Sequence, residues 1–276
     1  MKKLTLTVTI FSVLCALAYA GPESLPSSGK EMKQVMTTPA PECPSWSGFY
    51  IGGFGGFKFN NVDTDLRLDG DWILTNDTDR FDIQDFANDD LDSDGGEAGG
   101  LIGYNFQMNH WVFGLEVDGG YLWSRDSHNS GIFFASGGAG GEFSIATSFE
   151  SHYLITAGPR IGYAFCRWLP YVTGGVATGD IDYRQTVRSN FGNGGNDFRQ
   201  QGSTDDSNVG WMVGGGLEYA ITNHWRVRGQ YQYIDLGDVS FDTAGESRFF
   251  NFTGFTGHHE VSLREHNASF ALIFGF

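Results

Sequence analysis

Beyond its first 20 residues, the sequence lacks any run of about 18 consecutive apolar residues, the length that a membrane-spanning helix needs. Basic residues are also scarce, with 17 Lys and Arg against 33 Asp and Glu and a formal net charge of −16. Nucleic-acid binding needs a basic surface, so this balance argues against nucleic acid as a partner. The chain is rich instead in glycine and phenylalanine, with 40 and 24 residues. This composition favours strands with one lipid-facing and one polar face.

Proline is also rare, and its distribution separates an N-terminal arm from the rest of the chain. Five of the seven prolines fall between residues 21 and 45. Before them, two lysines precede a short apolar stretch, and Ala18-Tyr19-Ala20 has the small-x-small pattern of a cleavage site. We therefore expect a cleaved secretory signal peptide at 1–20, a flexible periplasmic arm at 21–45 and a folded domain at 46–276.

From Trp46 onward, the sequence predicts β-strands with a side-chain period of two. In the last segment, Phe270, Leu272, Phe274 and Phe276 alternate with small or polar residues. Each predicted strand is long enough to cross a bilayer. The eight expected ranges are 46–59, 97–108, 111–124, 147–165, 168–183, 208–221, 225–236 and 261–276.

The connections between these strands alternate in length. Three are very short, at Asn109-His110, Cys166-Arg167 and Asn223-His224. Four are long, at about 60–96, 125–146, 184–207 and 237–260. This alternation is typical of membrane barrels with tight periplasmic turns and long outer loops. The expected fold class is therefore all-β, an eight-stranded antiparallel up-and-down transmembrane β-barrel.

Charged residues occur in the middle of several predicted strands and must point away from lipid. Opposite charges should pair inside the barrel, because unpaired buried charges are costly. Eight strands enclose only enough space for side chains, so the sequence predicts a plugged barrel and not a wide pore. The expected lumen charges are Glu116, Asp118, Arg160, Glu218, Arg226, Arg228 and Glu265.

Several segments resemble a known family. Residues 210–220, the turn at 223–225 and Tyr231-Gln232-Tyr233-Ile234-Asp235-Leu236-Gly237 look like the penultimate hairpin of the outer-membrane β-barrel family, and 46–52 resembles its first strand. That family includes opacity-type surface antigens and is related to the barrel domain of OmpA. The resemblance implies a bacterial outer-membrane location. It also implies an assembly signal at Phe276 and Phe274 that the barrel-assembly machinery reads. It does not imply one activity.

Two cysteines follow the predicted signal peptide. Cys43 lies on the arm just before the first strand, and Cys166 lies in the second tight turn. Both should face the oxidising periplasm, where disulfides persist. An intramolecular bridge, two free thiols and an intermolecular bond are all compatible with this placement.

The first long connection is strongly acidic. Asp90, Asp92, Asp94 and Gly95 have the spacing that begins a calcium-binding loop. The closing Glu is missing, because the twelfth position is Leu101. Calcium binding and a merely solvated acidic loop therefore remain alternatives, and no other cofactor is expected.

Enzyme activity is not expected. The pairs Ser127-His128 and Ser151-His152 have no Gly-x-Ser-x-Gly elbow and no evident orienting partner. The favoured hypothesis is an integral outer-membrane protein in contact with lipids, with a structural or surface-interaction role and acidic extracellular loops. The alternatives are a small porin, an adhesin that binds an extracellular or host ligand through its loops, and a soluble lipocalin-like barrel.

Overall fold

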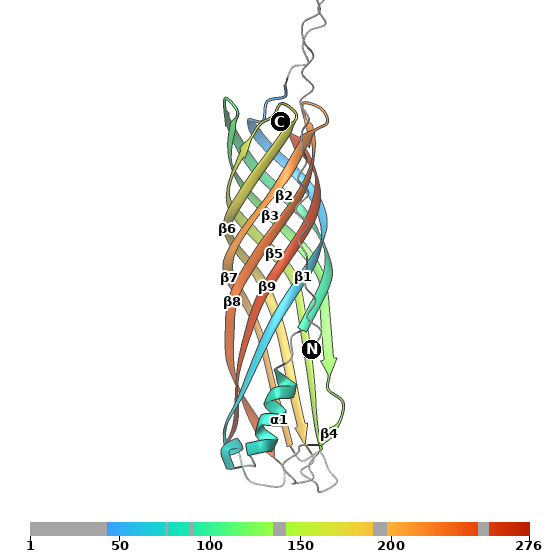
Figure 1. The fold of residues 1–276 in the computed structure, drawn as a ribbon, viewed down its shortest axis with the longest axis vertical. Helices are drawn as coiled ribbons and strands as arrows, with labels where there is room; N and C mark the ends of the chain where they lie inside the picture. Colours follow the sequence, from blue (N-terminus) through green and yellow to red (C-terminus); the bar gives the residue numbers. More distant parts are fainter. Residues whose placement is uncertain (1–42, 75–76, 89–90, 135–141, 190–197, 248–253) are drawn as a thin grey trace, which may run out of the picture. The chain divides into compact units, whose positions relative to one another are not determined.

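The computed structural model describes residues 43–74, 77–88, 91–134, 142–189, 198–247 and 254–276. Within them, long antiparallel strands wind around a common axis (Figure 1). The strands are β1 (Gly48–Gly70), β2 (Leu91–Met108), β3 (Trp111–Asn129), β4 (Phe133–Phe134), β5 (Glu142–Tyr163), β6 (Trp168–Ser189), β7 (Phe198–Ala220), β8 (Trp225–Ser247) and β9 (Phe255–Gly275). The helical elements are η1 (Asp71–Leu74) and α1 (Asp77–Ala87). Among the described residues, no helix is long and apolar enough to span a membrane.

Strand pairing closes the sheet into a ring. The order is β3-β2-β1-β9-β8-β7-β6-β5, and β3 also pairs with β5, while β4 adds only a short pairing to β5. The described part of the chain therefore has eight long strands in a closed antiparallel ring, which confirms the expected all-β fold. The first and last strands meet along their whole length, from Tyr50↔Gly275 to Gly70↔Phe255.

Tight turns and the C-terminus lie at one end of the ring, the upper end in Figure 1, and the longer connections lie at the other. We call these the short-turn end and the long-loop end. β2 and β3 are joined by Asn109-His110, and Asn109 adopts φ of 57°, a left-handed conformation that asparagine tolerates better than most residues. The three short turns fall where the sequence predicts them.

The strands extend much further toward the long-loop end than predicted. β1 continues to Gly70 where 59 was expected, and β9 begins at Phe255 where 261 was expected. Much of the four predicted long loops is therefore strand. Beyond the predicted end of β1 and the predicted start of β9, the alternation continues with its polarity reversed.

β9 shows this reversal most clearly. Near the short-turn end its outward residues Phe270, Leu272 and Phe276 are exposed, while Asn267 and Ser269 point inward and are buried. Near the long-loop end the inward residues are Val261 and Leu263, both 0% exposed. There the outward positions are polar: Thr256, His258, Glu260, Ser262 and Arg264.

An apolar core consequently fills the ring toward the long-loop end. Phe149, Tyr183, Ile234 and Leu263 belong to one of its buried clusters. A second cluster lies beside it and includes Trp72. The interior of the ring thus combines buried charged and polar side chains with small apolar clusters near the short turns, and is mainly apolar near the long loops.

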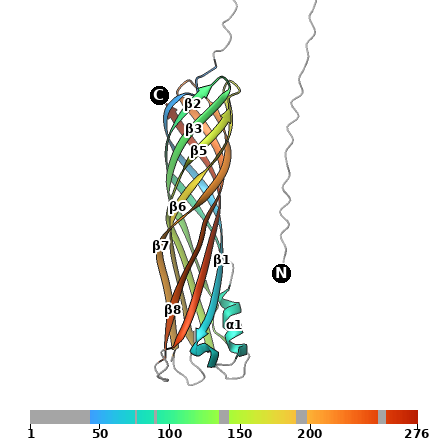
Figure 2. The same cartoon turned by 90° about the vertical axis from the view of Figure 1, so that its left-hand side faces the viewer.

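Helix α1 occupies part of the segment that was predicted to be loop. β2 begins opposite Val62, so the β1 edge beyond that residue has no β2 partner. α1 lies beside this edge (Figures 1 and 2). The Leu66 amide donates to Asn88 Oδ1 (2.6 Å), and Gln84 Nε2 donates to the Leu66 carbonyl (3.1 Å). These side chains satisfy backbone groups of β1 that an open edge would leave unpaired.

The same helix completes the apolar core. Ile83 and Ala87 are buried and pack in the cluster that contains Leu66, Leu68 and Trp72. The amphipathic signal was weak in the sequence, because aspartates alternate with the few apolar residues of the 11-residue helix. α1 therefore covers the core beside the part of β1 that has no β2 partner.

A buried histidine makes this core sensitive to acid. His259 stacks on Phe241, with ring centroids 4.7 Å apart, and its Nε2 lies 3.1 Å from Thr243 Oγ1. It lies beyond the apolar part of β9's outer face, toward the long-loop end. Burial, with a smaller contribution from the neighbouring His258, lowers the pKa of His259 to about 4, and Asp242 opposes this shift. An unfolded histidine has a pKa near 6.5.

We expect the long-loop half to lose stability as the pH falls from about 6.5 toward 4. In this pH range the unfolded state binds protons more readily than the folded state does. The resulting loss in the free energy of unfolding is about 3 kcal/mol at most. Hydrogen exchange of the β8–β9 amides, corrected for intrinsic rates, measures the loss of protection. In His259→Phe, part of this pH dependence should disappear. An equal loss of protection in the variant and in the wild type would contradict the assignment.

Candidate functional site

Four charged side chains from four different strands meet inside the ring near the short-turn end. They are Glu116 on β3, Arg160 on β5, Glu218 on β7 and Arg228 on β8, and all four are buried. We call them the ion cluster. Its two carboxylates and two guanidinium groups balance in charge, which a water-poor interior requires.

The contacts within the ion cluster are short and multiple. Arg228 donates from Nη1 and Nη2 to the two oxygens of Glu116, at 2.7 and 2.6 Å, and from Nε to Glu218 Oε1 at 3.0 Å. Arg160 donates to Glu116 Oε2 at 3.1 Å and also contacts Glu218. Bidentate arginine–carboxylate contacts fix geometry as well as charge.

Two tyrosines enclose the ion cluster. The Tyr50 hydroxyl donates to Glu116 Oε2 (2.7 Å), and the guanidinium carbon of Arg160 lies 3.9 Å from the Tyr171 ring centroid. A Cβ added at Gly103 would lie 2.2 Å from the Tyr50 hydroxyl, and one at Gly216 would lie 2.7 Å from the Tyr171 hydroxyl. These two glycines therefore provide the space that the tyrosine rings occupy.

The other three expected lumen charges lie outside the ion cluster. Asp118 is half-buried and accepts from Thr156 Oγ1 at 2.8 Å. Glu265 forms a fully buried ion pair with Lys58, at 2.6 Å. Lys58 was missed in the sequence, although it lies an even number of positions from Tyr50 on the same strand and so shares its inward face.

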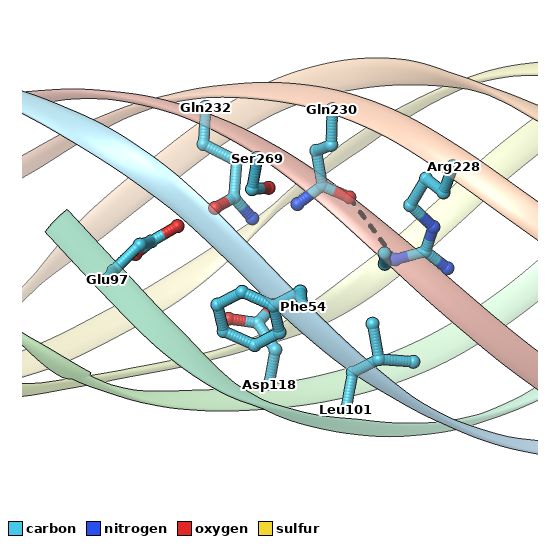
Figure 3. Close-up of a pocket in the computed structure, with 9 residues that line it drawn as sticks. Phe54, Glu97, Leu101, Asp118, Arg228, Gln230, Gln232 and Ser269 are labelled. Carbon is cyan, nitrogen blue, oxygen red and sulfur yellow. Dashed lines mark hydrogen bonds between the residues drawn. The ribbon is translucent and has the colours of Figure 1, made fainter.

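A small pocket lies beside the ion cluster, where side chains from β1, β2, β3, β8 and β9 converge (Figure 3). Arg228 Nη1 donates to Gln230 Oε1 at 3.2 Å on one side of this pocket. Glu97, also missed in the sequence, lines another side and accepts from Asn267 Nδ2 at 2.8 Å. The lining of the pocket combines charged and amide side chains with Phe54, Leu101 and Ala271.

The third expected charge, Arg226, lies at the mouth of the ring, beside Trp46. Its guanidinium carbon lies 4.7 Å from the Trp46 ring centroid, and its Nη2 donates to the Ser45 carbonyl at 3.2 Å. Trp46 is 1% exposed and donates from Nε1 to the Cys166 carbonyl at 3.1 Å. In the structure Cys43 and Cys166 form a disulfide, with Cα atoms 4.7 Å apart. The segment before β1 thus places Trp46 inside the short-turn mouth.

The segment proposed as a calcium loop is only partly described, and calcium binding there stays a prediction. Asp92 and Asp94 lie on β2, where their backbones pair with Asn61 and Phe59. Asp90 falls outside the described residues. The Ser-His pair at 151–152 is also split, because Ser151 is buried inside the ring and His152 lies on the outer face.

The terminal aromatic residues lie on the outside of the closing strand. Phe276 is exposed, its amide donates to the Phe49 carbonyl (2.9 Å), and its ring contacts that of Phe274 edge to face at 5.3 Å. An assembly role for Phe276 and Phe274 stays a prediction.

A belt of large apolar side chains surrounds the outside of the ring toward its short-turn end. These outward residues are 41% to 78% exposed, an arrangement that would be unfavourable in water. The belt includes Phe49, Ile102, Phe106, Phe113, Leu115, Val172, Trp211, Val213, Phe270 and Leu272.

A family model described as an outer membrane protein beta-barrel domain matches residues 35–258. The chain belongs to this outer-membrane β-barrel family. The 31 kDa outer-membrane immunogenic protein of Brucella melitensis is 33% identical over 199 residues, covering 70% of this chain and 72% of that protein. The 25 kDa outer-membrane immunogenic protein of Brucella abortus is 26% identical over 203 residues, covering 73% and 70%. Among solved structures, Neisserial surface protein A is similar at 14% identity, covering 83% of this chain and 98% of that chain, with a TM-score of 0.38.

Membership of the outer-membrane β-barrel family places this protein in the bacterial outer membrane, with its apolar belt in contact with lipid. In such barrels the short turns face the periplasm and the long connections face outward. By this rule we expect the ion cluster at the level of the membrane, and the apolar core and α1 toward the extracellular side.

Removing one member of the ion cluster should strongly destabilise the barrel. In Glu116→Ala, two guanidinium groups would share a single carboxylate, and breaking a buried pair costs about 3–5 kcal/mol. Urea unfolding in lipid vesicles measures this loss. Glu260→Gln, on the exposed outer face of β9, is the matched control and should unfold like the wild type. A Glu116→Ala midpoint equal to that of the control would show that the ion cluster is dispensable.

Proposed function

We propose that this protein is a closed outer-membrane barrel with a structural and surface-interaction role, and not a channel. The observation that carries the proposal is that side chains fill the interior of the ring at two levels. The ion cluster spans the interior at membrane level, and the apolar core fills it toward the extracellular side.

The periplasmic mouth supports the same proposal. Trp46 packs there among Val112, Ala164 and Leu169. The bridge between Cys43 and Cys166 is part of the proposal, because it would hold Trp46 in place in the oxidising periplasm. A solute would have to displace Trp46, the ion cluster and the apolar core in turn.

Planar-bilayer recordings test the closed barrel. The wild-type protein should give no stable conductance, and Trp46→Ala should give none either, because the ion cluster and the apolar core still block the path. Addition of a reductant should not open a conductance for the same reason. Heat-modifiable migration of the same samples verifies that the barrel is folded. Stable single-channel conductance of folded wild-type protein would favour the small-porin alternative.

Exposed large apolar residues, most of them aromatic, at the extracellular end support a surface-interaction role. Phe81 and Phe86 on α1 are 60% and 49% exposed, and Ile132 and Phe134 near β4 are 70% and 69% exposed. Phe86 also stacks on Phe133, with ring centroids 4.2 Å apart, which joins α1 to the β4 segment. Exposed aromatic residues held on a rigid support commonly anchor protein partners.

A direct test compares the binding of protein-coated beads to host cells. The double variant Phe81→Ser, Ile132→Ser should lose at least half of the wild-type binding, while Glu260→Gln should keep it. Folding is checked by heat-modifiable migration in each case. Undiminished binding by the double variant would exclude this aromatic surface as the contact, and absence of wild-type binding would remove the adhesin alternative.

A further inference from the structure

A second group of polar side chains lies on the outer wall of the ring, away from the ion cluster. The pairing of β5 with β6 shifts register between Glu150 and Leu154, so β5 carries one extra residue there. Such bulges reorient side chains and free backbone groups from the ladder. Glu150 and His152 on β5 consequently lie opposite Asp182 and Asp180 on β6.

Asp180 is held in place by the bulge. Its Oδ1 accepts from the backbone amides of His152 at 2.9 Å and of Tyr153 at 2.8 Å. Its other oxygen, Oδ2, lies 2.8 Å from His152 Nδ1. One carboxylate oxygen of Asp180 therefore accepts hydrogen bonds from two backbone amides of the bulge, and the other oxygen contacts the imidazole of His152.

A second carboxylate converges on the same ring nitrogen. Asp182 Oδ2 lies 3.6 Å from His152 Nδ1, and the ligand atoms of the three residues all lie within 4.8 Å of one another. Metal–ligand bonds of about 2.0–2.2 Å place neighbouring ligand atoms roughly 3–3.5 Å apart. The His152–Asp182 separation of 3.6 Å is close to this spacing, whereas the His152–Asp180 hydrogen bond of 2.8 Å would have to open to admit an ion. In the described part of the chain, no other group of His, Cys, Asp and Glu meets this criterion.

Glu150 lies on the opposite side of the imidazole, 3.8 Å from Nε2. A carboxylate behind a metal-bound histidine orients the ring and raises its basicity.

We propose that His152, Asp180 and Asp182 bind a divalent transition-metal ion such as Zn²⁺ on the outer wall, with Glu150 as the supporting carboxylate. An imidazole ligand favours zinc, copper or nickel over calcium and magnesium, which prefer oxygen ligands alone. The three ligand side chains are partly exposed, so the ion can enter and retains open positions for water. The ring of Tyr121, at the edge of the apolar belt, lies 6.5 Å from that of His152. The site is independent of whether the lumen is closed.

Calorimetric titration of Zn²⁺ into folded protein, purified without a histidine tag, tests the proposal. The wild type should bind one ion, and His152→Asn and Asp182→Asn should weaken binding by at least about tenfold. Asp182 is the preferred carboxylate variant because Asp180 also supports the bulge. The matched control is His258→Asn, which alters a His–Asp pair with a 2.6 Å contact but no second carboxylate ligand in the described residues. It should bind like the wild type.

Two results would overturn the proposal. Unchanged zinc affinity in His152→Asn would show that the imidazole is not a ligand. Calcium binding as tight as zinc binding would identify the group as an ordinary acidic patch. Circular dichroism and heat-modifiable migration establish that each variant is folded before its titration is interpreted.

Discussion

The constraint on which this structure depends is that lipid offers no hydrogen-bond partner to a peptide group. A sheet in contact with lipid must therefore pair every strand on both sides. The pairings of β1 with β9 and of β3 with β5 meet this requirement by closing the ring. Closure with eight strands leaves an interior only wide enough for side chains. The charges that cannot face lipid must then neutralise one another in that narrow space, as the ion cluster does.

The same strands meet two solvents along their length. At membrane level the apolar side chains face outward and the interior contains the buried charges, whereas toward the extracellular end the outer face is polar and the interior is mainly apolar. Beyond the membrane an unpaired edge is tolerable if side chains cover it. Gln84 of α1 and Asn88, which directly follows the helix, do so for β1, and the helix adds Ile83 to the core. One chain thus combines a membrane barrel with an extension built like a water-soluble β-protein.

Features with a local cause were predictable from the sequence. Outward residues such as Phe113 and Leu115 alternate with Glu116, so both the strand and its faces followed from the period of two. The reversed polarity beyond residue 59 was missed, because the prediction assumed one solvent for the whole strand. α1 was missed because its stability comes from the β1 edge and the core, not from its own sequence.

Contacts between distant strands were harder to predict. The Lys58–Glu265 pair required the β1–β9 register, and the convergence of His152 with Asp180 and Asp182 required a one-residue bulge. Neither feature has a signal within its own segment. By contrast, the inward direction of Arg160 and Glu218 followed from the cost of placing charge in lipid, although their partners did not.

Accessibility scanning along β9 tests most directly whether the outer face of the strand passes from lipid into water. Single cysteines at the outward positions 256, 260, 264, 268 and 272, spin-labelled in lipid vesicles with the Cys43–Cys166 bridge intact, report contact with water-soluble and lipid-soluble relaxation agents. The account predicts water contact at 256, 260 and 264 and lipid contact at 272, with the change between 264 and 272. Lipid contact along the whole series, or water contact at 272, would contradict it.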